Sequence, residues 1–196
     1  KQMKKTLLAL MATASIFLAS CGSKSDSAQT AVADEALTVD NVLDNAEKYV
    51  GDTIVVEGEC SHLCKHGGRK AFLVSAKDDR MLRAEAAGAF GAFEKDAIHK
   101  VLRVKGMLVE DRIDEAAVKK MEADYAKLEE VHGENVEVGC ESEKAAQGQS
   151  EINTFAARMK DYRNKIAERQ AKEGKAYLSF YHIDAESYEI VKSEKK

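Results

Sequence analysis

The sequence predicts a mainly β fold, a small barrel of five strands with a helical hairpin inserted between the fourth and fifth strands. Two observations favour this fold. Short segments rich in β-branched residues are separated by turns that contain glycine and aspartate. Two later segments place apolar residues at alternating steps of three and four, the spacing of helices that pack on one another. With 196 residues and 44% hydrophobic composition, the chain is typical of one globular domain.

The first twenty residues have the pattern of an export signal. A start with three lysines precedes an apolar stretch at residues 7–18, which is too short for a bilayer because spanning needs about 20 apolar residues. Leu18-Ala19-Ser20-Cys21 then resembles the lipobox of bacterial lipoproteins. We therefore expect residues 1–20 to be removed as a signal peptide and Cys21 to become a lipid-modified N-terminus. The alternative is a plain secretory signal with an incidental cysteine.

Residues 21–37 are predicted to be the lipidated cysteine and a flexible tether, because they are polar and show no periodicity. The lipoprotein resemblance implies a lipid anchor in the cell envelope. Gly22 stands where enterobacterial lipoproteins retained in the inner membrane carry aspartate, which favours the outer membrane and leaves the leaflet open.

The charge balance of the chain excludes some partners. The net charge is −4, and it becomes −7 once the three lysines of the leader are removed. An acidic surface argues against nucleic-acid binding, where phosphate neutralisation dominates affinity. It argues equally against a polybasic contact with lipid headgroups.

The folded domain is expected over residues 38–192 and begins with a short helix. Thr38 can cap this helix, whose apolar positions run from Val39 to Val50, and Gly51-Asp52 ends it. The next predicted elements are strands at Thr53–Cys60, Lys70–Ala76 and Met81–Ala86, a short helix at Phe93–Lys100 and a strand at Val101–Val109. Turns at Gly67-Gly68 and Asp78-Asp79 separate the first three strands.

A helical insertion is predicted at residues 115–173. Its first apolar stripe consists of Val118, Met121, Tyr125, Leu128 and His132, and its second of Ile152, Phe155, Met159, Tyr162 and Ile166. Each stripe is narrow, so we expect an antiparallel hairpin joined by residues 133–151. Two strands are expected after Gly174, at Lys175–His182 and Ser187–Lys192, with a turn near Asp184.

This order of elements is that of the OB-fold, a five-stranded barrel with a helix between its third and fourth strands. The segment Tyr49–Gly58 resembles the entry to the first strand in OB-fold proteins related to the tRNA-anticodon-binding group. Over residues 38–192 the chain resembles uncharacterised OB-fold lipoproteins of Bacteroidetes, in which a Cys-x-His-x-Cys-Lys-His-Gly-Gly segment follows the first strand, as Cys60–Gly68 does here. The resemblance implies the fold and the location but no activity. A small α+β domain with an open sheet is the rival fold.

One segment has the residues for chemistry, and three interpretations of it stay open. Cys60, His62, Cys64 and His66 occupy alternate positions, which share one face of a regular strand. If a turn folds the segment back, they could bind Zn²⁺, Cu(I) or haem iron. Alternatively, Cys60 and Cys64 form a disulfide or redox pair. In the third interpretation, one of the two cysteines is a small buried hydrophobe and the histidines are surface loop groups.

His132 and Cys140 are possible additional ligands. His132 continues the stripe of the first inserted helix, which favours a packing role, and Cys140 could join the site only if the connector folds back. With Cys21 lipidated, three cysteines remain. An odd number leaves a free thiol, an intermolecular bridge or a shared ligand.

The expected function is that of a membrane-anchored binding or accessory protein, with a soft metal ion or haem at the Cys60–His66 segment. One alternative is an adaptor that uses the helical hairpin to contact another envelope protein. Another is a thiol redox protein that uses Cys60 and Cys64. The sequence has no P-loop, no Rossmann fingerprint and no nucleophile elbow, which weakens any assignment as an enzyme.

Overall fold

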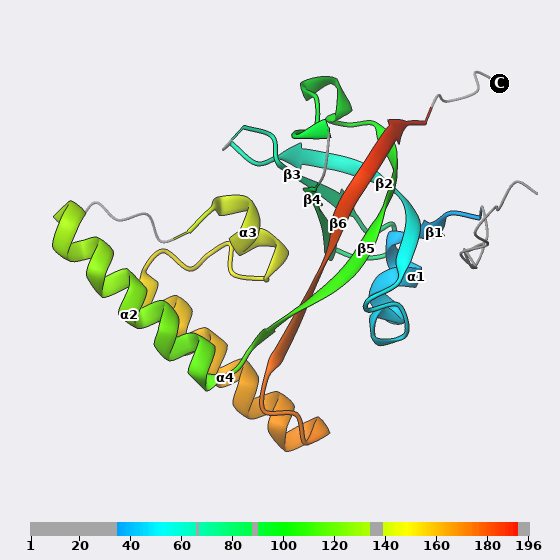
Figure 1. The fold of residues 1–196 in the computed structure, drawn as a ribbon. Helices are drawn as coiled ribbons and strands as arrows, with labels where there is room; N and C mark the ends of the chain where they lie inside the picture. Colours follow the sequence, from blue (N-terminus) through cyan, green and yellow to red (C-terminus); the bar gives the residue numbers. More distant parts are fainter. Residues whose placement is uncertain (1–34, 66, 88–89, 134–138, 192–196) are drawn as a thin grey trace, which may run out of the picture. The chain divides into compact units, whose positions relative to one another are not determined.

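The computed structural model describes residues 35–65, 67–87, 90–133 and 139–191, which form a closed five-stranded barrel with one extra strand (Figure 1). The strands are β1 (Leu37–Thr38), β2 (Thr53–Leu63), β3 (Lys70–Val74), β4 (Met81–Ala86), β5 (Val101–Ile113) and β6 (Leu178–Ile190). They pair in the order β1-β2-β3-β4-β6-β5, and β2 also pairs with β5, which closes the barrel. The β4–β6 pair is parallel. This is the connectivity of an OB-fold, so the predicted fold class is confirmed.

The helices are α1 (Val39–Asp44), α2 (Glu115–His132), α3 (Glu141–Ala146) and α4 (Phe155–Glu173), with single 3-10 turns η1 (Ala46–Lys48) and η3 (Lys95–Ala97). Thr38 caps α1 as predicted, because its hydroxyl accepts a hydrogen bond from the Asn41 amide at 3.1 Å. The helix is shorter than predicted because Asn45 leaves the helical region and η1 follows. The helix predicted at Phe93–Lys100 is likewise reduced to η3.

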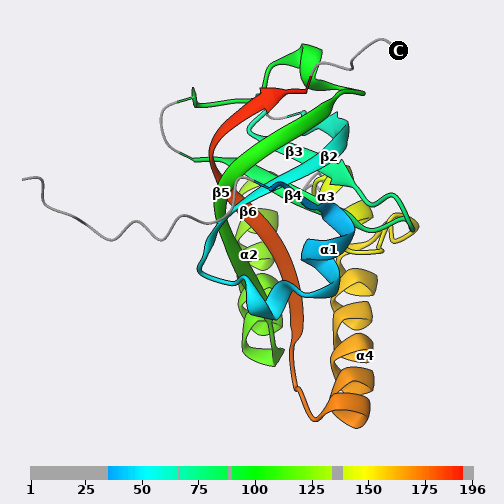
Figure 2. The same ribbon diagram turned by 90° about the vertical axis from the view of Figure 1, so that its right-hand side faces the viewer.

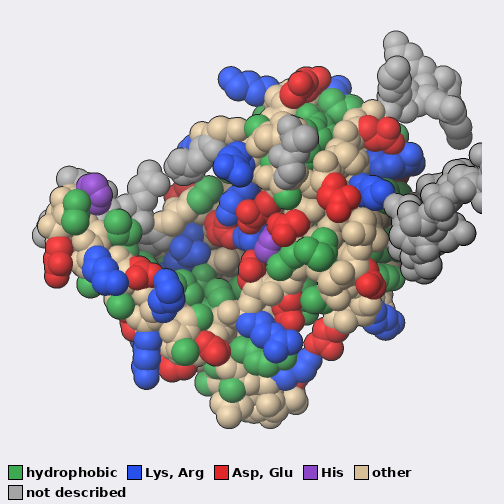
Figure 3. All heavy atoms as spheres, in the orientation of Figure 1, with side chains coloured by type: hydrophobic (Ala, Val, Ile, Leu, Met, Phe, Trp, Pro, Cys, Tyr) green, Lys and Arg blue, Asp and Glu red, His purple; other side chains and the backbone are tan. Residues whose placement is uncertain are grey.

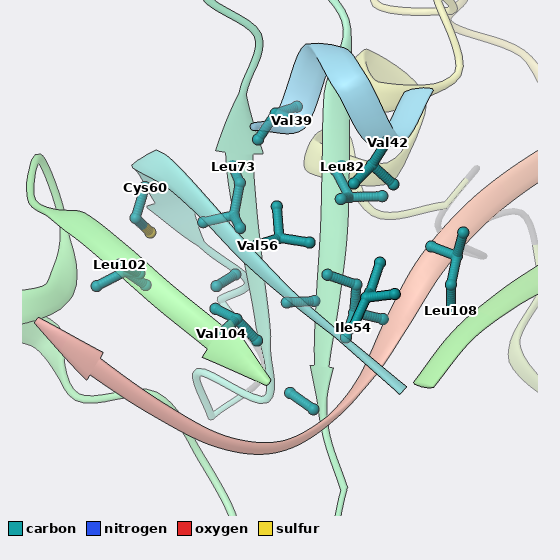
Figure 4. Packing of buried hydrophobic residues seen from close by; sticks show 14 of the residues in the cluster. Val39, Val42, Ile54, Val56, Cys60, Leu73, Leu82, Leu102, Val104 and Leu108 are labelled. Atoms are coloured by element: carbon teal, nitrogen blue, oxygen red, sulfur yellow. The ribbon is translucent and has the colours of Figure 1, made fainter. Parts of the chain in front are cut away.

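The barrel core is built from the alternate residues of each strand. Along β5, Leu102, Val104 and Leu108 are buried while their neighbours in the barrel region are exposed. Figure 4 shows these side chains directed toward those of β2, β3 and β4 in the barrel interior, with Val39 and Val42 of α1 alongside. Helix α1 approaches β2 closely at Gly58, where an added Cβ would lie 2.5 Å from Val39 Cγ2.

The prediction of two final strands with a turn near Asp184 is wrong, because β6 runs unbroken from Leu178 to Ile190. The polar residues that suggested a turn contain a β-bulge instead. Ala185 pairs with Gly106 and Ser187 with Lys105, so Glu186 is an extra residue on β6. Gly106 makes this close approach possible, since a Cβ there would lie 2.2 Å from the Asp184 carbonyl oxygen.

The insertion lies between β5 and β6, as predicted. Figure 2 shows the two strands leaving the barrel together and leading to α2 and α4. The hairpin is antiparallel, because Arg163 of α4 pairs with Glu115 near the start of α2 while Tyr125 farther along α2 stacks on Phe155 at the start of α4. A second hydrophobic cluster holds it together, formed by Val118, Met159, Tyr162 and Ile166. Helix α3, in the connector between α2 and α4, was not predicted.

Candidate functional site

A β-bulge at Ser61 determines which face of the sheet each side chain of the cysteine–histidine segment occupies. Cys60 pairs with Leu73 and His62 pairs with Phe72, so Ser61 is an extra residue on β2. Because Leu73 and Phe72 are neighbours on β3, they face opposite sides of the sheet, and so do Cys60 and His62. The expectation that all the alternate residues share one face is therefore wrong for Cys60.

Cys60 is completely buried in the barrel core (Figure 4). Its thiol donates to the His62 carbonyl oxygen at 3.4 Å, and burial raises the pKa of that thiol. Cys64 is four positions after Cys60 along the strand, a separation of roughly 13 Å at about 3.3 Å per residue, whereas a disulfide needs Cα atoms within about 7 Å. The geometry therefore gives no basis for a redox pair of Cys60 and Cys64.

His62 lies on the outer face of the sheet, where its ring stacks on Phe72 with 4.5 Å between centroids and 8° between planes. The Ser61 hydroxyl donates to the Phe72 carbonyl oxygen at 3.2 Å, and its oxygen lies 2.8 Å from His62 Nδ1. This network assigns the proton of the neutral ring to Nδ1 and leaves a lone pair on Nε2. His62 Nε2 is buried with no hydrogen-bond partner among the described residues, and burial lowers the pKa of His62.

Cys64 faces the same side as His62, because it lies opposite Lys70 just beyond the end of β2. Its sulfur accepts a hydrogen bond from the Lys70 amide at 3.3 Å. Cys64 and Cys140 line one cavity of about 320 Å³, together with Arg69, Lys70, Glu85, Ala86 and Glu143. The connector thus folds back, as inclusion of Cys140 requires, but it brings Cys140 to Cys64 and not to Cys60.

Charged residues hold α3 over this face of the barrel. Glu143 of α3 contacts Lys70 of β3, with 3.1 Å between Oε2 and Nζ, and its other oxygen accepts from Arg83 of β4. The Arg83 guanidinium also lies 2.8 Å from Glu85 and 2.9 Å from Asp111. Figure 3 shows acidic and basic side chains gathered at the centre of this face.

A second cavity, of about 230 Å³, is also lined by Glu143. Its lining includes Arg80, Arg83, Gln147 and Tyr181. OB-folds bind ligands on the face of their second and third strands and in the adjacent loops, which here correspond to β3, β4 and the helical insertion. The insertion therefore covers the usual binding face and leaves two cavities that share Glu143 in their lining.

The remaining predicted site residues lie elsewhere. Cys21 and His66 fall outside the described residues. The expectation that His132 packs in the hairpin is wrong, because His132 is exposed at the end of α2. It does not line the cavity either. Among the residues that the structure describes, no three Cys, His, Asp or Glu side chains are grouped closely enough to hold a metal ion.

Sequence reasoning missed Lys70, Arg83 and Glu143. Alternation in β3 and β4 was the available signal for the first two, because their neighbours Ala71 and Leu82 are apolar and buried. Glu143 gave no such signal, since the segment Glu141–Ala146 is short and polar.

Two further findings bear on function. Over the described part of the chain, no helix has both the length and the apolar character needed to span a bilayer. Comparison with known protein families, with curated proteins and with solved structures finds no match to this chain.

Proposed function

We propose that the chain is a lipid-anchored OB-fold protein of the cell envelope that binds a soft metal ion between Cys64 and Cys140. One observation carries the proposal: these cysteines, 76 positions apart, line a single cavity between the end of β2 and the start of α3. The face beneath α3 is also the face on which OB-folds bind ligands.

The chemistry of the cavity favours Cu(I). Thiolates select soft ions such as Cu(I), which two sulfurs can hold, whereas a structural Zn²⁺ site takes four ligands. The basic side chains of Arg69 and Lys70 in the cavity lining are balanced by the carboxylates of Glu85 and Glu143. At about 320 Å³ the cavity is at the small end of ligand pockets, which favours an ion over haem.

The location rests on the leader and on Cys21. A basic start, an apolar stretch and the Leu-Ala-Ser-Cys sequence support export and lipidation, and Gly22 supports the outer membrane. The acidic balance of the chain supports a ligand other than nucleic acid. Replacing Cys21 by Ser should abolish labelling by palmitate and release the protein from the membrane fraction; retention there would contradict the lipid anchor.

Copper binding can be tested on the full chain, extracted in detergent, reduced and kept free of oxygen. Titration with Cu(I) against a chromophoric chelator should show one ion bound per chain. Cys64→Ser and Cys140→Ser should each abolish this binding. Cys60→Ser is the matched control and should bind as the unaltered protein does. Absence of copper binding, or binding that survives both substitutions, would refute the proposal.

An adaptor role is the second candidate, favoured by exposed apolar side chains near the end of α2. Leu128 and Val131 are 47% and 74% exposed, and the apolar cluster of the hairpin uses neither. If this surface docks on another envelope protein, Leu128→Ser with Val131→Ser should remove crosslinks formed in native membranes. The unfolding midpoint should stay unchanged, and persistence of the crosslinks would exclude this surface.

A further inference from the structure

A chain of contacts links Cys64 to the helix that begins directly after Cys140. The Lys70 amide donates to Cys64 Sγ at 3.3 Å, and the Lys70 ammonium lies 3.1 Å from Glu143. Glu143 is one helical turn after Cys140, the residue that caps the start of α3. Lys70 therefore contacts Cys64 directly and contacts the helix that begins after Cys140, and both cysteines line one cavity.

This arrangement suggests which of the three cysteines after Cys21 can pair and which one stays a single thiol. Cys60 is enclosed by the barrel core, and extended strand separates it from Cys64. Among the described residues, Cys64 and Cys140 are the two cysteines that line one cavity. Cys140 occupies the N-cap position of α3, outside the helix and at the end of the connector.

We propose that Cys64 and Cys140 form a reversible disulfide that empties the metal site and locks α3 on the barrel. The oxidant is a low-molecular-weight or protein disulfide. One thiolate attacks a sulfur of the oxidant and releases a thiol, and the second thiolate then displaces the other half as a second thiol. Two electrons and two protons pass to the oxidant. The regulatory meaning of this step rests on the proposed function, but the disulfide itself requires no metal.

The disulfide would fix the start of α3, because contacts with α4 already hold the end of this helix. The Gln147 side chain, directly after α3, accepts hydrogen bonds from the Tyr162 hydroxyl and from Arg158. At the start of α3, Glu143 supplies ion pairs to the barrel. A disulfide at Cys140 would add a covalent link one turn from Glu143. Reduction would leave that end held by charged contacts and expose both sulfurs to an ion.

The test uses the full chain in detergent, free of metal and treated with oxidised glutathione. Peptide mass spectrometry should find a Cys64–Cys140 cross-linked peptide that lacks two hydrogen atoms relative to the two thiol peptides. Cys60→Ser should give the same product, whereas Cys64→Ser and Cys140→Ser should give glutathione adducts on the remaining cysteine. Adducts on both cysteines of the unaltered chain, without a cross-link, would overturn the proposal. A cross-link that includes Cys60 would do so as well.

A second measurement separates the disulfide from the metal site. The oxidised protein should lose Cu(I) binding by at least tenfold and regain it after treatment with a reductant. A chain that cross-links but binds no copper when reduced would refute the proposed function and support the disulfide. A chain that binds copper when reduced but never cross-links would refute the disulfide and support the proposed function.

Discussion

Glu143 of α3 and Lys70 of β3 form an ion pair at 3.1 Å across 73 positions of sequence, and the second oxygen of the same carboxylate contacts Arg83. One side chain thus ties the inserted helix to two neighbouring strands. The Glu143 and Arg83 side chains are only 17% and 12% exposed. Solvent therefore screens this contact less than it screens an ion pair on a helix surface.

Replacing Glu143 with Gln should lower the free energy of unfolding by about 1–3 kcal/mol, because charge-assisted hydrogen bonds in a largely buried position are lost. Urea denaturation would measure the change, and amide exchange should rise in α3. Asp124→Asn is the control, since Asp124 pairs with Lys120 on an exposed helix surface and should cost less than about 0.5 kcal/mol. Equal losses in the two variants would contradict a special role for Glu143.

Gly106→Ala should destabilise the barrel by about 3 kcal/mol or more, because the added Cβ collides with the backbone of β6 at the Glu186 bulge. Gly51→Ala is a useful comparison. Gly51 has a φ of 88° but open space around it, so its cost is conformational and about 1–2 kcal/mol. Chemical denaturation of both variants would compare the two costs; a Gly106 variant no less stable than the Gly51 variant would show that the strands separate easily here.

His62 should make stability depend on pH. Burial lowers the pKa of folded His62 below its ordinary value of 6.5, so the unfolded chain takes up a proton first as the pH falls. The stability that neutral His62 contributes is complete above pH 6.5 and is lost between 6.5 and the lowered pKa of the folded state. Relative to His62→Gln, the unaltered protein should lose stability on going from about pH 7.5 to about pH 5. Parallel unfolding curves for the two proteins at every pH would rule this out.

Thiol labelling should distinguish the cysteines. Cys140 is partly exposed, whereas Cys60 is buried and its thiol pKa is raised by that burial. In the reduced native protein, a maleimide should modify Cys140 at least about tenfold faster than Cys60, because the thiolate is the reactive form. Peptide mass spectrometry over a time course gives both rates, and denaturation should equalise them. Similar rates in the native protein would mean that Cys60 is not held in the core.

Elements with a strong local pattern could be predicted from the sequence. The strand at Met81–Ala86 and the helix at Glu115–His132 have the bounds that alternation and helical spacing indicate. The bulges at Ser61 and Glu186 could not be predicted, because an extra residue in a strand leaves no mark on local composition. Helix α3 is too short and too polar to be recognised without the charged face that it covers.

The candidate site was predictable only in part, for the same physical reason. Cys64 and His62 lie on a common outer face, as their spacing indicates, but the Ser61 bulge turns Cys60 inward. Cys140 reaches the cavity through tertiary contacts of the connector, which no spacing along the chain encodes. The metal ligands foreseen at Cys60, His62, Cys64 and His66 are thus replaced in the proposed site by Cys64 and Cys140.

The extra residue in β2 also affects how related chains should be recognised. Loss of the residue at position 61 would leave Cys60 toward the interior and His62 toward the exterior, because Ser61 adds length without adding a pair. Loss of Leu63 would instead turn the thiol of Cys64 inward and destroy the cavity lining. A search pattern for chains with this arrangement should therefore accept either one residue or none between the first cysteine and the histidine, and require one residue between the histidine and the second cysteine.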